Sequence, residues 1–311
     1  MLARLQRCIT LALLATAGAW LVYFLVQGQP VLAWSGCALL LFGHAAVLGV
    51  EFCISRHISR NDATGPANLP ELLRAWWGEC RAAPLVFCWQ QPFRARAIPD
   101  HLGPPARVAG YRGVVFIHGL FCNRGFWNPW LRALGGGHHA FAAVSLEPVF
   151  GSIDNYVTQI EDAVRRVTNA TGMPPLLVCH SMGGLAARAW LRHMRAADRV
   201  YRVVTIGTPH HGTWLARFGH TENSRQMRPL SSWFQQLDGG QPANQHAGHA
   251  VGFTCWYSNC DNIVFPVSNA TLPGASNRLV RAAGHVQLAF MPEVMAQTLA
   301  LLQPGGVAPA P

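Results

Sequence analysis

The first 60 residues contain two long apolar runs, whereas the rest of the chain alternates short apolar runs with amphipathic stretches. Residues 9–26 read ITLALLATAGAWLVYFLV and residues 31–50 read VLAWSGCALLLFGHAAVLGV, without one Asp, Glu, Lys or Arg. Each run is long enough to cross about 30 Å of hydrocarbon as a helix. The pattern predicts a membrane anchor over residues 1–60 with two transmembrane helices, at 9–26 and 31–50.

Arginines flank these two runs. Arg4 and Arg7 precede the first, Arg56 and Arg60 follow the second, and the connector 27–30 is uncharged. Because positive residues favour the cytoplasmic side of a membrane, the pattern predicts a hairpin with both ends in the cytoplasm.

Two alternatives to the hairpin follow from the same residues. Residues 1–19 could form a signal peptide cleaved after the AGA at 17–19, which would place the rest of the chain in the periplasm. A buried helical hairpin of a soluble protein is less compatible with two uncharged runs of this length.

The remaining chain divides by composition into three parts. Residues 61–110 are rich in Pro and Arg, which predicts a membrane-proximal linker and the first elements of a soluble domain. Within them, residues 74–89 contain adjacent tryptophans and lie either at the lipid headgroups or as a helix and strand on that domain. Residues 111–303 predict the main domain, and the Pro- and Gly-rich tail 304–311 predicts disorder.

From residue 111 onward, buried strands alternate with helices. Continuous apolar runs are typical of strands covered on both faces, and strand–helix alternation predicts a mostly parallel sheet with helices on both sides. The residues on one face of 152–167 have helical spacing. The expected strands are 113–119, 139–146, 176–179, 199–209, 251–257 and one that begins near 277 and leads into a loop at His285, with helices over 152–167 and from about 183 to 194.

Ser181 occupies the turn between a buried strand and a helix in the segment LLVCHSMGGLAARAW. A sharp strand-to-helix turn pushes the hydroxyl above the carboxyl edge of the sheet and points the free N–H groups of the helix toward it. Small neighbours are needed there, and Gly183 and Gly184 provide them. The pattern predicts Ser181 as a nucleophile, although a serine in this context can also be a simple helix cap.

A serine nucleophile needs a histidine base and a carboxylate that orients it. Asp261 follows the apolar run 251–257, and His285 stands in a loop after another strand, so the order serine, aspartate, histidine is preserved. We therefore expect Ser181, Asp261 and His285 to form a catalytic triad. Asp238 is the alternative carboxylate, and it is less favoured because no strand leads into it.

The residues that follow the first strand of the main domain suggest a binding site for an oxyanion. His118 and Gly119 end that strand, so the backbone N–H of Leu120 can face the space above Ser181. Paired with the N–H of Met182, it would provide two donors to a developing negative charge.

The segments VVFIHGLFCNRGFW, LLVCHSMGGLAAR, VVTIGTPHHGT, SNCDNIVFP and GHVQL resemble the α/β-hydrolase superfamily, and within it the bacterial triacylglycerol lipases and esterases. The resemblance covers residues 111–290 and implies an α/β-hydrolase fold with Ser181, Asp261 and His285 as triad and Leu120 with Met182 as oxyanion donors. It implies no cofactor and no metal. Departures are Cys179 in place of the usual glycine, a short cap at 212–250, and the N-terminal hairpin.

Composition and charge limit the partners. The formal charge is +10, and all 24 basic residues are arginine, which suits an anionic lipid surface. No nucleic-acid-binding motif is present, so no nucleic-acid partner is expected. The 9 cysteines lack CxxC spacing, which argues against a zinc site and leaves open a bond between Cys255 and Cys260.

The resemblance and the anchor together predict a membrane-anchored serine hydrolase that cleaves carboxylic esters of acyl lipids. Its expected place is the inner membrane of a bacterium, with the catalytic domain cytoplasmic or, in the alternative, periplasmic. An acyltransferase or thioesterase would use the same triad with another acceptor, and a non-catalytic membrane scaffold would keep only the fold. The aromatic and apolar residues of the cap either line an acyl pocket or form the core of the cap: Trp214, Leu215, Phe218, Trp233 and Phe234.

Overall fold

Six parallel strands form the central sheet of the computed structural model, which describes residues 1–135, 137–239 and 251–303. Their order across the sheet is β2-β1-β3-β4-β5-β6, and neighbouring strands pair in parallel throughout. This confirms the parallel sheet predicted from the strand–helix alternation. The strands are β1 Val114–Ile117, β2 Phe141–Ala143, β3 Leu176–His180, β4 Arg202–Ile206, β5 Phe253–Ser258 and β6 Ser276–Val280.

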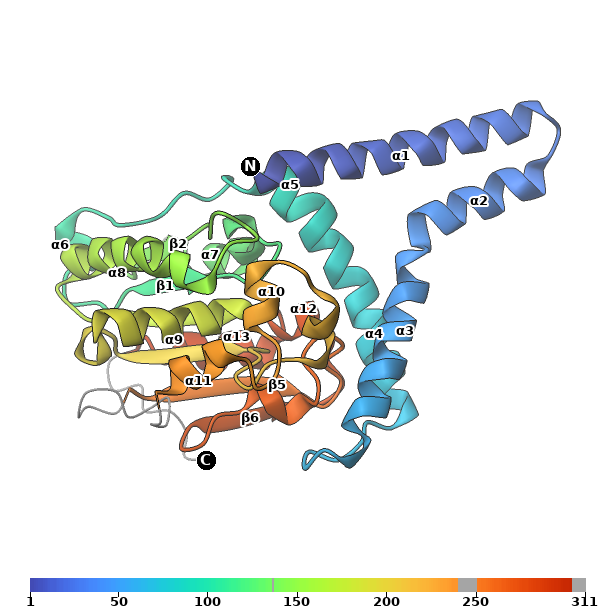
Figure 1. Cartoon of the computed structure of the whole chain (residues 1–311). Helices are drawn as coiled ribbons and strands as arrows, with labels where there is room; N and C mark the ends of the chain where they lie inside the picture. Colours follow the sequence, from blue (N-terminus) through green and yellow to red (C-terminus); the bar gives the residue numbers. More distant parts are fainter. Residues whose placement is uncertain (136, 240–250, 304–311) are drawn as a thin grey trace.

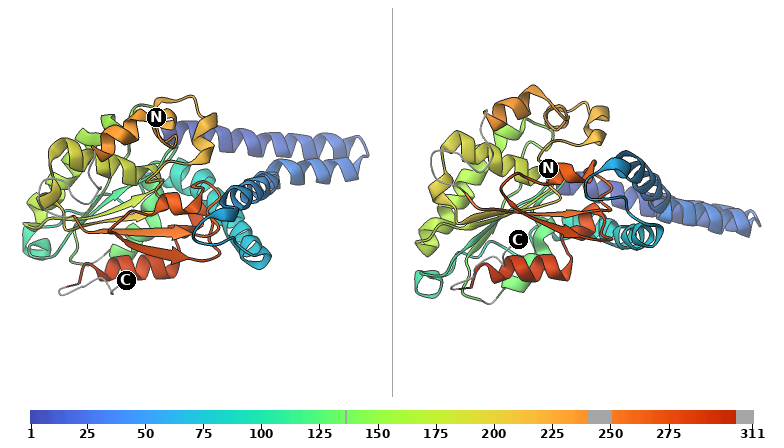
Figure 2. Two further views of the ribbon diagram at one scale, coloured as in Figure 1. Left: turned by 60° about the horizontal axis from the view of Figure 1, so that its bottom comes forward. Right: turned by 90° about the horizontal axis from the view of Figure 1, so that it is seen from below.

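Helices cover both faces of the sheet (Figures 1 and 2). Alternate residues of β1 point to opposite sides, with Val115 and Ile117 in one apolar core and Val114 and Phe116 in the other. The first core contains α8 Val157–Thr171, α9 Met182–Met194 and α11 Ser232–Asp238, and the second contains α7 Asn128–Leu134 and α13 Pro292–Ala300. All four β1 side chains are buried, so the strand has a fixed position from which the site is built.

The smaller helical elements lie mostly in the connections. They are α6 Pro105–Val108, η3 Arg124–Trp127, η4 Ile153–Tyr156, η5 Ala197–Arg199, η6 Trp214–Phe218, α10 Glu222–Gln226, η7 Val267–Ala270 and α12 His285–Leu288. The helix expected over 152–167 is formed by η4 and α8 and ends at Gly172, whose φ of 73° is a left-handed cap that glycine adopts without strain.

Two N-terminal helices, α1 Leu2–Val26 and α2 Pro30–Phe42, project from the domain as an antiparallel pair (Figure 1). Among the described residues, α1 is the single helix that is long and apolar enough by itself to cross a membrane, and 11% of its apolar window is buried. The first arm of the expected transmembrane hairpin is therefore supported by length and composition, whereas the second arm differs from the prediction.

The second predicted span, 31–50, is not one helix. It is divided at Gly43 between α2 and α3 His44–Ile58, and this helical pair is bent by 49°. The ring nitrogens of His44 lie 3.2 Å from the carbonyl oxygen of Leu41 and 3.3 Å from that of Cys80 on the next helix. These contacts accommodate the break and direct α3 along the catalytic domain.

Residues 61–110 are more structured than a linker. The short helix η1 Ser59–Asn61 ends at their first residue, and they contain α4 Leu69–Pro84, the π-helical segment η2 Leu85–Gln90 and α5 Gln91–Arg94. Asn68 and Glu71 form a reciprocal capping box at the start of α4. The apolar run near 85–89, a strand in one of the two alternatives, continues the helix from α4 into α5 instead. The α4 helix packs beside α3 (Figure 1).

Two further expectations are settled by the positions of the residues. Cys255 and Cys260 are both free thiols, so the bond left open between them is absent. In the cap, Trp233 and Phe234 are buried in the core under α9, which is the second of the two roles considered for them. The predicted disordered tail 304–311 and the cap residues 240–250 lie outside the described residues.

Candidate active site

Ser181 stands at a strained turn between β3 and α9. Its φ of 54° and ψ of −132° lie in a backbone region that residues other than glycine rarely adopt. A Cβ on Gly119 would lie 2.7 Å from the Ser181 Cβ, and one on Gly183 would lie 2.3 Å from the Ile117 carbonyl oxygen. Glycine is required at both positions because the chain segments approach each other closely, as expected of a sharp strand-to-helix turn.

His285 and Asp261 are in direct contact. The His285 Nδ1 lies 3.0 Å from Asp261 Oδ1 and 2.9 Å from Oδ2, and both side chains are buried. Asp261 Oδ1 also accepts hydrogen bonds of 2.8 Å from the N–H groups of Ile263 and Val264. These bonds fix the carboxylate in the loop after β5, so that it can orient an Nδ1–H of the histidine.

The charge around His285 outweighs its burial. Burial by itself lowers the pKa of His285, but the charge of Asp261 and its hydrogen bond raise it, with smaller contributions from Glu79 and Glu51. The net result is a pKa above the ordinary value for an imidazole. A base with this pKa binds a proton readily.

The turn before Leu120 is held by His118. Burial lowers the pKa of His118 to about 4, so the ring is neutral at physiological pH. Its Nε2 accepts from the Leu146 N–H at 3.1 Å, which leaves the Nδ1–H to donate to the Gly119 carbonyl at 2.9 Å. Leu120 borders the same cavity as Ser181, while Met182 is the first residue of α9, where N–H groups have no acceptor within the helix.

Ser181 and His285 open into one cavity of about 320 Å³. The described contacts include no hydrogen bond between the two side chains, although both border this space. Its wall comes from the sheet edge on one side and from α3, α4 and η2 on the other. The apolar lining consists of Leu48, Ala83, Phe87, Leu120, Phe121, Cys122, Ile263 and Val286.

This geometry agrees with comparisons to known proteins. A family model described as the alpha/beta hydrolase family matches residues 114–305, more than half of the chain. The chain belongs to the alpha/beta hydrolase family. The fold and the family expected from the sequence are thereby confirmed.

Solved lipase structures share the fold of this alpha/beta hydrolase. The mature lipase BlEst2 of Bacillus licheniformis is 19% identical, with a TM-score of 0.52 over 61% of this chain and 92% of that one. Lipase B of Aspergillus fumigatus is 20% identical, with a TM-score of 0.54 over 62% of this chain and 52% of that one. At identities of 19% and 20%, these similarities show the fold of the catalytic domain.

The structure brings together Ser181, His285 and Asp261 at one edge of the sheet, while Asp238 ends α11 in the cap. His180 is turned aside, stacked on Phe126 with its Nε2 3.1 Å from the His285 carbonyl oxygen. Trp214 borders a separate cavity against α3 rather than the one at Ser181. Among the described residues, no cluster of three or more His, Cys, Asp or Glu side chains could hold a metal ion.

Two acidic residues of this hydrolase were missed by the sequence interpretation. Glu79 on α4 and Glu51 on α3 both border the cavity at Ser181. Burial raises the pKa of Glu79 to about 7, even though its carboxylate accepts from the N–H groups of Gln287 and Val286. A signal existed for Glu51, because it is the first acidic residue of the chain and directly follows an uncharged run.

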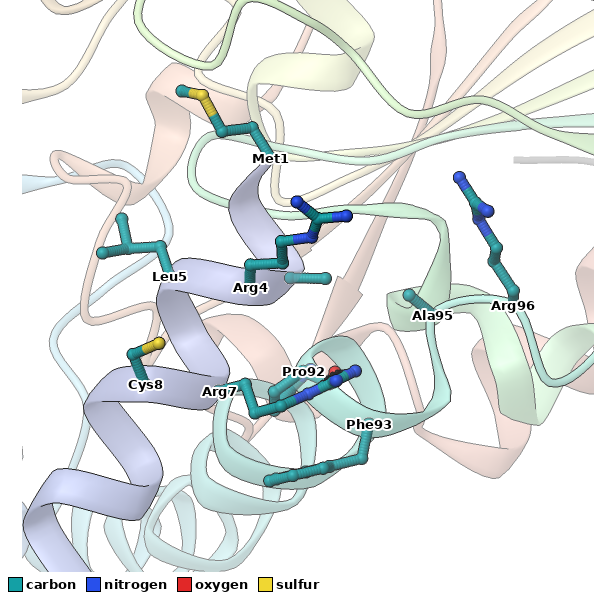
Figure 3. A pocket seen from close by; sticks show the side chains of 10 residues that line it. Met1, Arg4, Leu5, Arg7, Cys8, Pro92, Phe93, Ala95 and Arg96 are labelled. Carbon is teal, nitrogen blue, oxygen red and sulfur yellow. Dashed lines mark hydrogen bonds between the residues drawn. The ribbon is translucent and has the colours of Figure 1, made fainter.

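A larger cavity, of about 790 Å³, lies where α1 meets the segment after α5. Figure 3 shows Arg4 and Arg7 on the first turns of α1 and Arg96 on the facing segment. Arg7 binds the segment that faces α1: its guanidinium donates to the Pro92 carbonyl at 2.9 Å and lies over the Phe93 ring. This cavity shares no lining residue with the one at Ser181.

Proposed function

We propose that this alpha/beta hydrolase cleaves carboxylic esters of acyl lipids through an acyl-enzyme on Ser181. His285 takes the proton of the Ser181 hydroxyl as the oxygen attacks the ester carbonyl, and then gives it to the departing alcohol. Asp261 holds the imidazole in its tautomer and stabilises the imidazolium. The observation that carries the proposal is the buried pair of His285 and Asp261, bordering one cavity with a serine at a strained turn.

The second half-reaction repeats the first with water. His285 removes a proton from a water molecule, the resulting oxygen attacks the acyl carbonyl, and the proton returns to the Ser181 oxygen as the carboxylic acid leaves. In both halves the carbonyl oxygen gains negative charge. We assign its stabilisation to the N–H groups of Leu120 and Met182, and removal of one such donor typically costs about 10²–10³ in kcat.

The lining of the cavity supports an acyl chain as the group that is bound. Apolar side chains from α3, α4 and η2 face the Ser181 side of the sheet, and an apolar wall gains free energy by excluding water from a hydrocarbon chain. The solved structures that share this fold include two named as lipases. A lipid ester therefore suits both the wall and the fold.

We also assign this hydrolase to a bacterial inner membrane through α1. The helix exposes large apolar side chains such as Val22 and Val26, which are 62% and 79% exposed, and such a surface is stable in hydrocarbon. The α2 helix has 13 residues and rises about 20 Å, which is too short for a return span by itself, so the return to the domain side is assigned to the bent pair of α2 and α3. The positive charges of Arg4 and Arg7 support a cytoplasmic position for the domain end of α1.

The catalytic assignment is tested with Ser181→Ala in the full chain. The variant should lose hydrolysis of short p-nitrophenyl esters while its thermal unfolding transition stays that of the wild type. More than a few per cent of wild-type activity in the folded variant would reject Ser181 as nucleophile. An inactive wild type toward oxygen esters and thioesters, with and without added alcohol acceptors, would favour a scaffold.

The membrane assignment is tested by fractionation. The protein should stay in the membrane fraction after carbonate extraction, and its catalytic domain should resist protease added to the periplasmic side. Release by carbonate would reject the anchor, and digestion from the periplasm would reverse the orientation.

A further inference from the structure

We propose that Glu79, which lies on α4 outside the hydrolase sheet, is a positioning residue that holds His285 against Asp261. The inference rests on the proposed function, because it gives His285 the role of base. Among the described residues, the hydrogen bonds of the Glu79 carboxylate go to backbone N–H groups of α12 and not to Ser181. It acts through the short helix α12, whose first residue is His285.

Both oxygens of Glu79 are bonded to the start of α12. Oε1 accepts the N–H of Val286 at 2.9 Å and Oε2 accepts the N–H of Gln287 at 2.9 Å. These are the two residues directly after His285, so the carboxylate fixes the backbone on which the imidazole is carried. The side chain is 2% exposed, which keeps water from replacing these bonds.

Two glycines permit this contact. A Cβ on Gly284 would lie 2.6 Å from Glu79 Oε2, and a Cβ on Gly78 would lie 2.1 Å from the side-chain oxygen of Gln287. A side chain at Gly284 would therefore displace Glu79, and one at Gly78 would displace the end of the Gln287 side chain. The close approach belongs to this pair of helices and brings a buried carboxylate to the histidine loop.

A second carboxylate reaches the same histidine from α3. Glu51 Oε2 accepts the Asn262 Nδ2–H at 2.8 Å, and Asn262 Oδ1 accepts the backbone N–H of His285 at 3.0 Å. Glu51 thereby fixes the orientation of the Asn262 amide. His285 is consequently held from three sides, by Asp261 on its ring, by Asn262 on its N–H, and by Glu79 on the next two residues.

The charge of Glu79 acts on the pKa of His285, and a residue that only packed against α12 would not change that pKa. The charged groups that act on His285 are Asp261, Glu79 and Glu51, and the groups that act on Glu79 are His285 and Asp261. The neutral ring of His180 packs tilted against His285 at 4.7 Å between centroids. Because burial raises the pKa of Glu79 to about 7, its charge is partly present where His285 titrates, so its removal should lower the pKa of His285 and move the acid limb of kcat/KM to lower pH.

The test compares Glu79→Gln with wild type as the full chain in detergent micelles. Glutamine can accept one of the two N–H groups, but its NH₂ then faces the other. We expect kcat/KM on a p-nitrophenyl ester to fall on the order of tenfold to a hundredfold, as for a displaced catalytic group. Its acid limb should shift to lower pH. An unchanged limb together with unchanged kcat/KM would overturn the proposal.

Two companion variants keep the result decisive. Glu79→Asp retains the charge but shortens the side chain by one methylene. We therefore expect kcat to fall while the acid limb stays at the same pH. A wild-type kcat in this variant would overturn the proposal even if Glu79→Gln failed to fold. Glu71→Gln is the matched control on the same helix, since Glu71 pairs with Arg281 and Asn259 rather than with α12. It should lower thermal stability and leave the acid limb unchanged.

A measurement independent of turnover separates this proposal from the proposed function. The Nδ1 proton resonance of His285, identified by its loss in His285→Ala, reports the histidine pKa by its titration in NMR spectra. A lower pKa in Glu79→Gln, in a protein that hydrolyses no ester, would support the positioning role and reject the proposed function. An unchanged pKa in an active enzyme would do the reverse.

Discussion

The sheet domain and the N-terminal helices of this hydrolase differ in how far their apolar side chains are exposed. The β1 residues Val114 and Ile117 are 0% exposed, whereas Val26 at the tip of α1 is 79% exposed and Leu39 on α2 is 71% exposed. The sheet encloses its own apolar core, while α1 and α2 leave theirs uncovered. An uncovered apolar surface of this kind marks an interaction site, and the proposed partner is membrane lipid.

The same two regions are nevertheless joined at the catalytic loops. Gln6 on α1 donates to the Phe121 carbonyl at 3.2 Å, and Ser55 on α3 donates to the Asp261 carbonyl at 2.6 Å. Glu79 on α4 accepts the N–H of Val286, the residue after His285. The sheet domain thus carries the candidate triad, and the N-terminal helices hold the loops that present it. The lesson is that helices proposed as a membrane anchor can also support the loops of the candidate active site.

The largest expected effect separates the two candidate carboxylates, Asp261 after β5 and Asp238 in the cap. Asp261→Asn should lower kcat by about 10⁴, because an amide no longer holds the histidine tautomer. Asp238→Asn, at the end of α11, should change the rate very little. Steady-state kinetics at similar KM checks the difference, and the account of the site would have to be redrawn around α11 if Asp238→Asn were the inactive variant.

A second contrast concerns stability. Ile117→Ala in the buried strand should lower the free energy of unfolding by about 2–5 kcal/mol, because it opens a cavity in a packed core. Leu39→Ala on the exposed face of α2 should change it by less than about 0.5 kcal/mol in detergent. Thermal denaturation of both variants provides the comparison. Equal losses would mean that α2 is covered by protein rather than by lipid.

The pH dependence sharpens the role of the charges around the histidine. His285 must be neutral to accept the proton of Ser181, so activity is lost as pH falls through its pKa. Because that pKa lies above its ordinary value, the acid limb of kcat/KM should lie above about pH 6.5. A pH titration of kcat/KM checks it, and a limb below pH 6 would contradict the electrostatic account.

The smallest expected effect is at the contact between α1 and the Leu120 loop. Gln6→Ala removes hydrogen bonds to Gln91 and Phe121, which should lower stability by about 0.5–1.5 kcal/mol and reduce kcat modestly. Gln27→Ala, at the exposed far end of the same helix, is the matched control and should behave as wild type. Identical behaviour of the two variants would show that α1 only anchors.

The sequence predicted the part of the molecule in which local pattern and tertiary structure agree. Strands β1 and β3, the turn at Ser181 and the positions of Asp261 and His285 are set by buried runs followed by small residues, which periodicity reveals. The break at Gly43 was missed because it depends on His44 bonding a carbonyl of α4, a contact between distant residues. Glu79 was missed for the same reason, since a mid-helix glutamate looks solvated until its partners on α12 are known.

The most direct test of the central claim is labelling of the full chain in its membrane with a fluorophosphonate probe. Such a probe bonds to a serine oxygen only when a neighbouring base activates it. We predict one labelled peptide containing Ser181 in the wild type, no labelling in Ser181→Ala or His285→Ala, and full labelling in Asp238→Asn. Absence of label from Ser181 in the folded wild-type protein, or equal labelling in folded His285→Ala, would contradict the account.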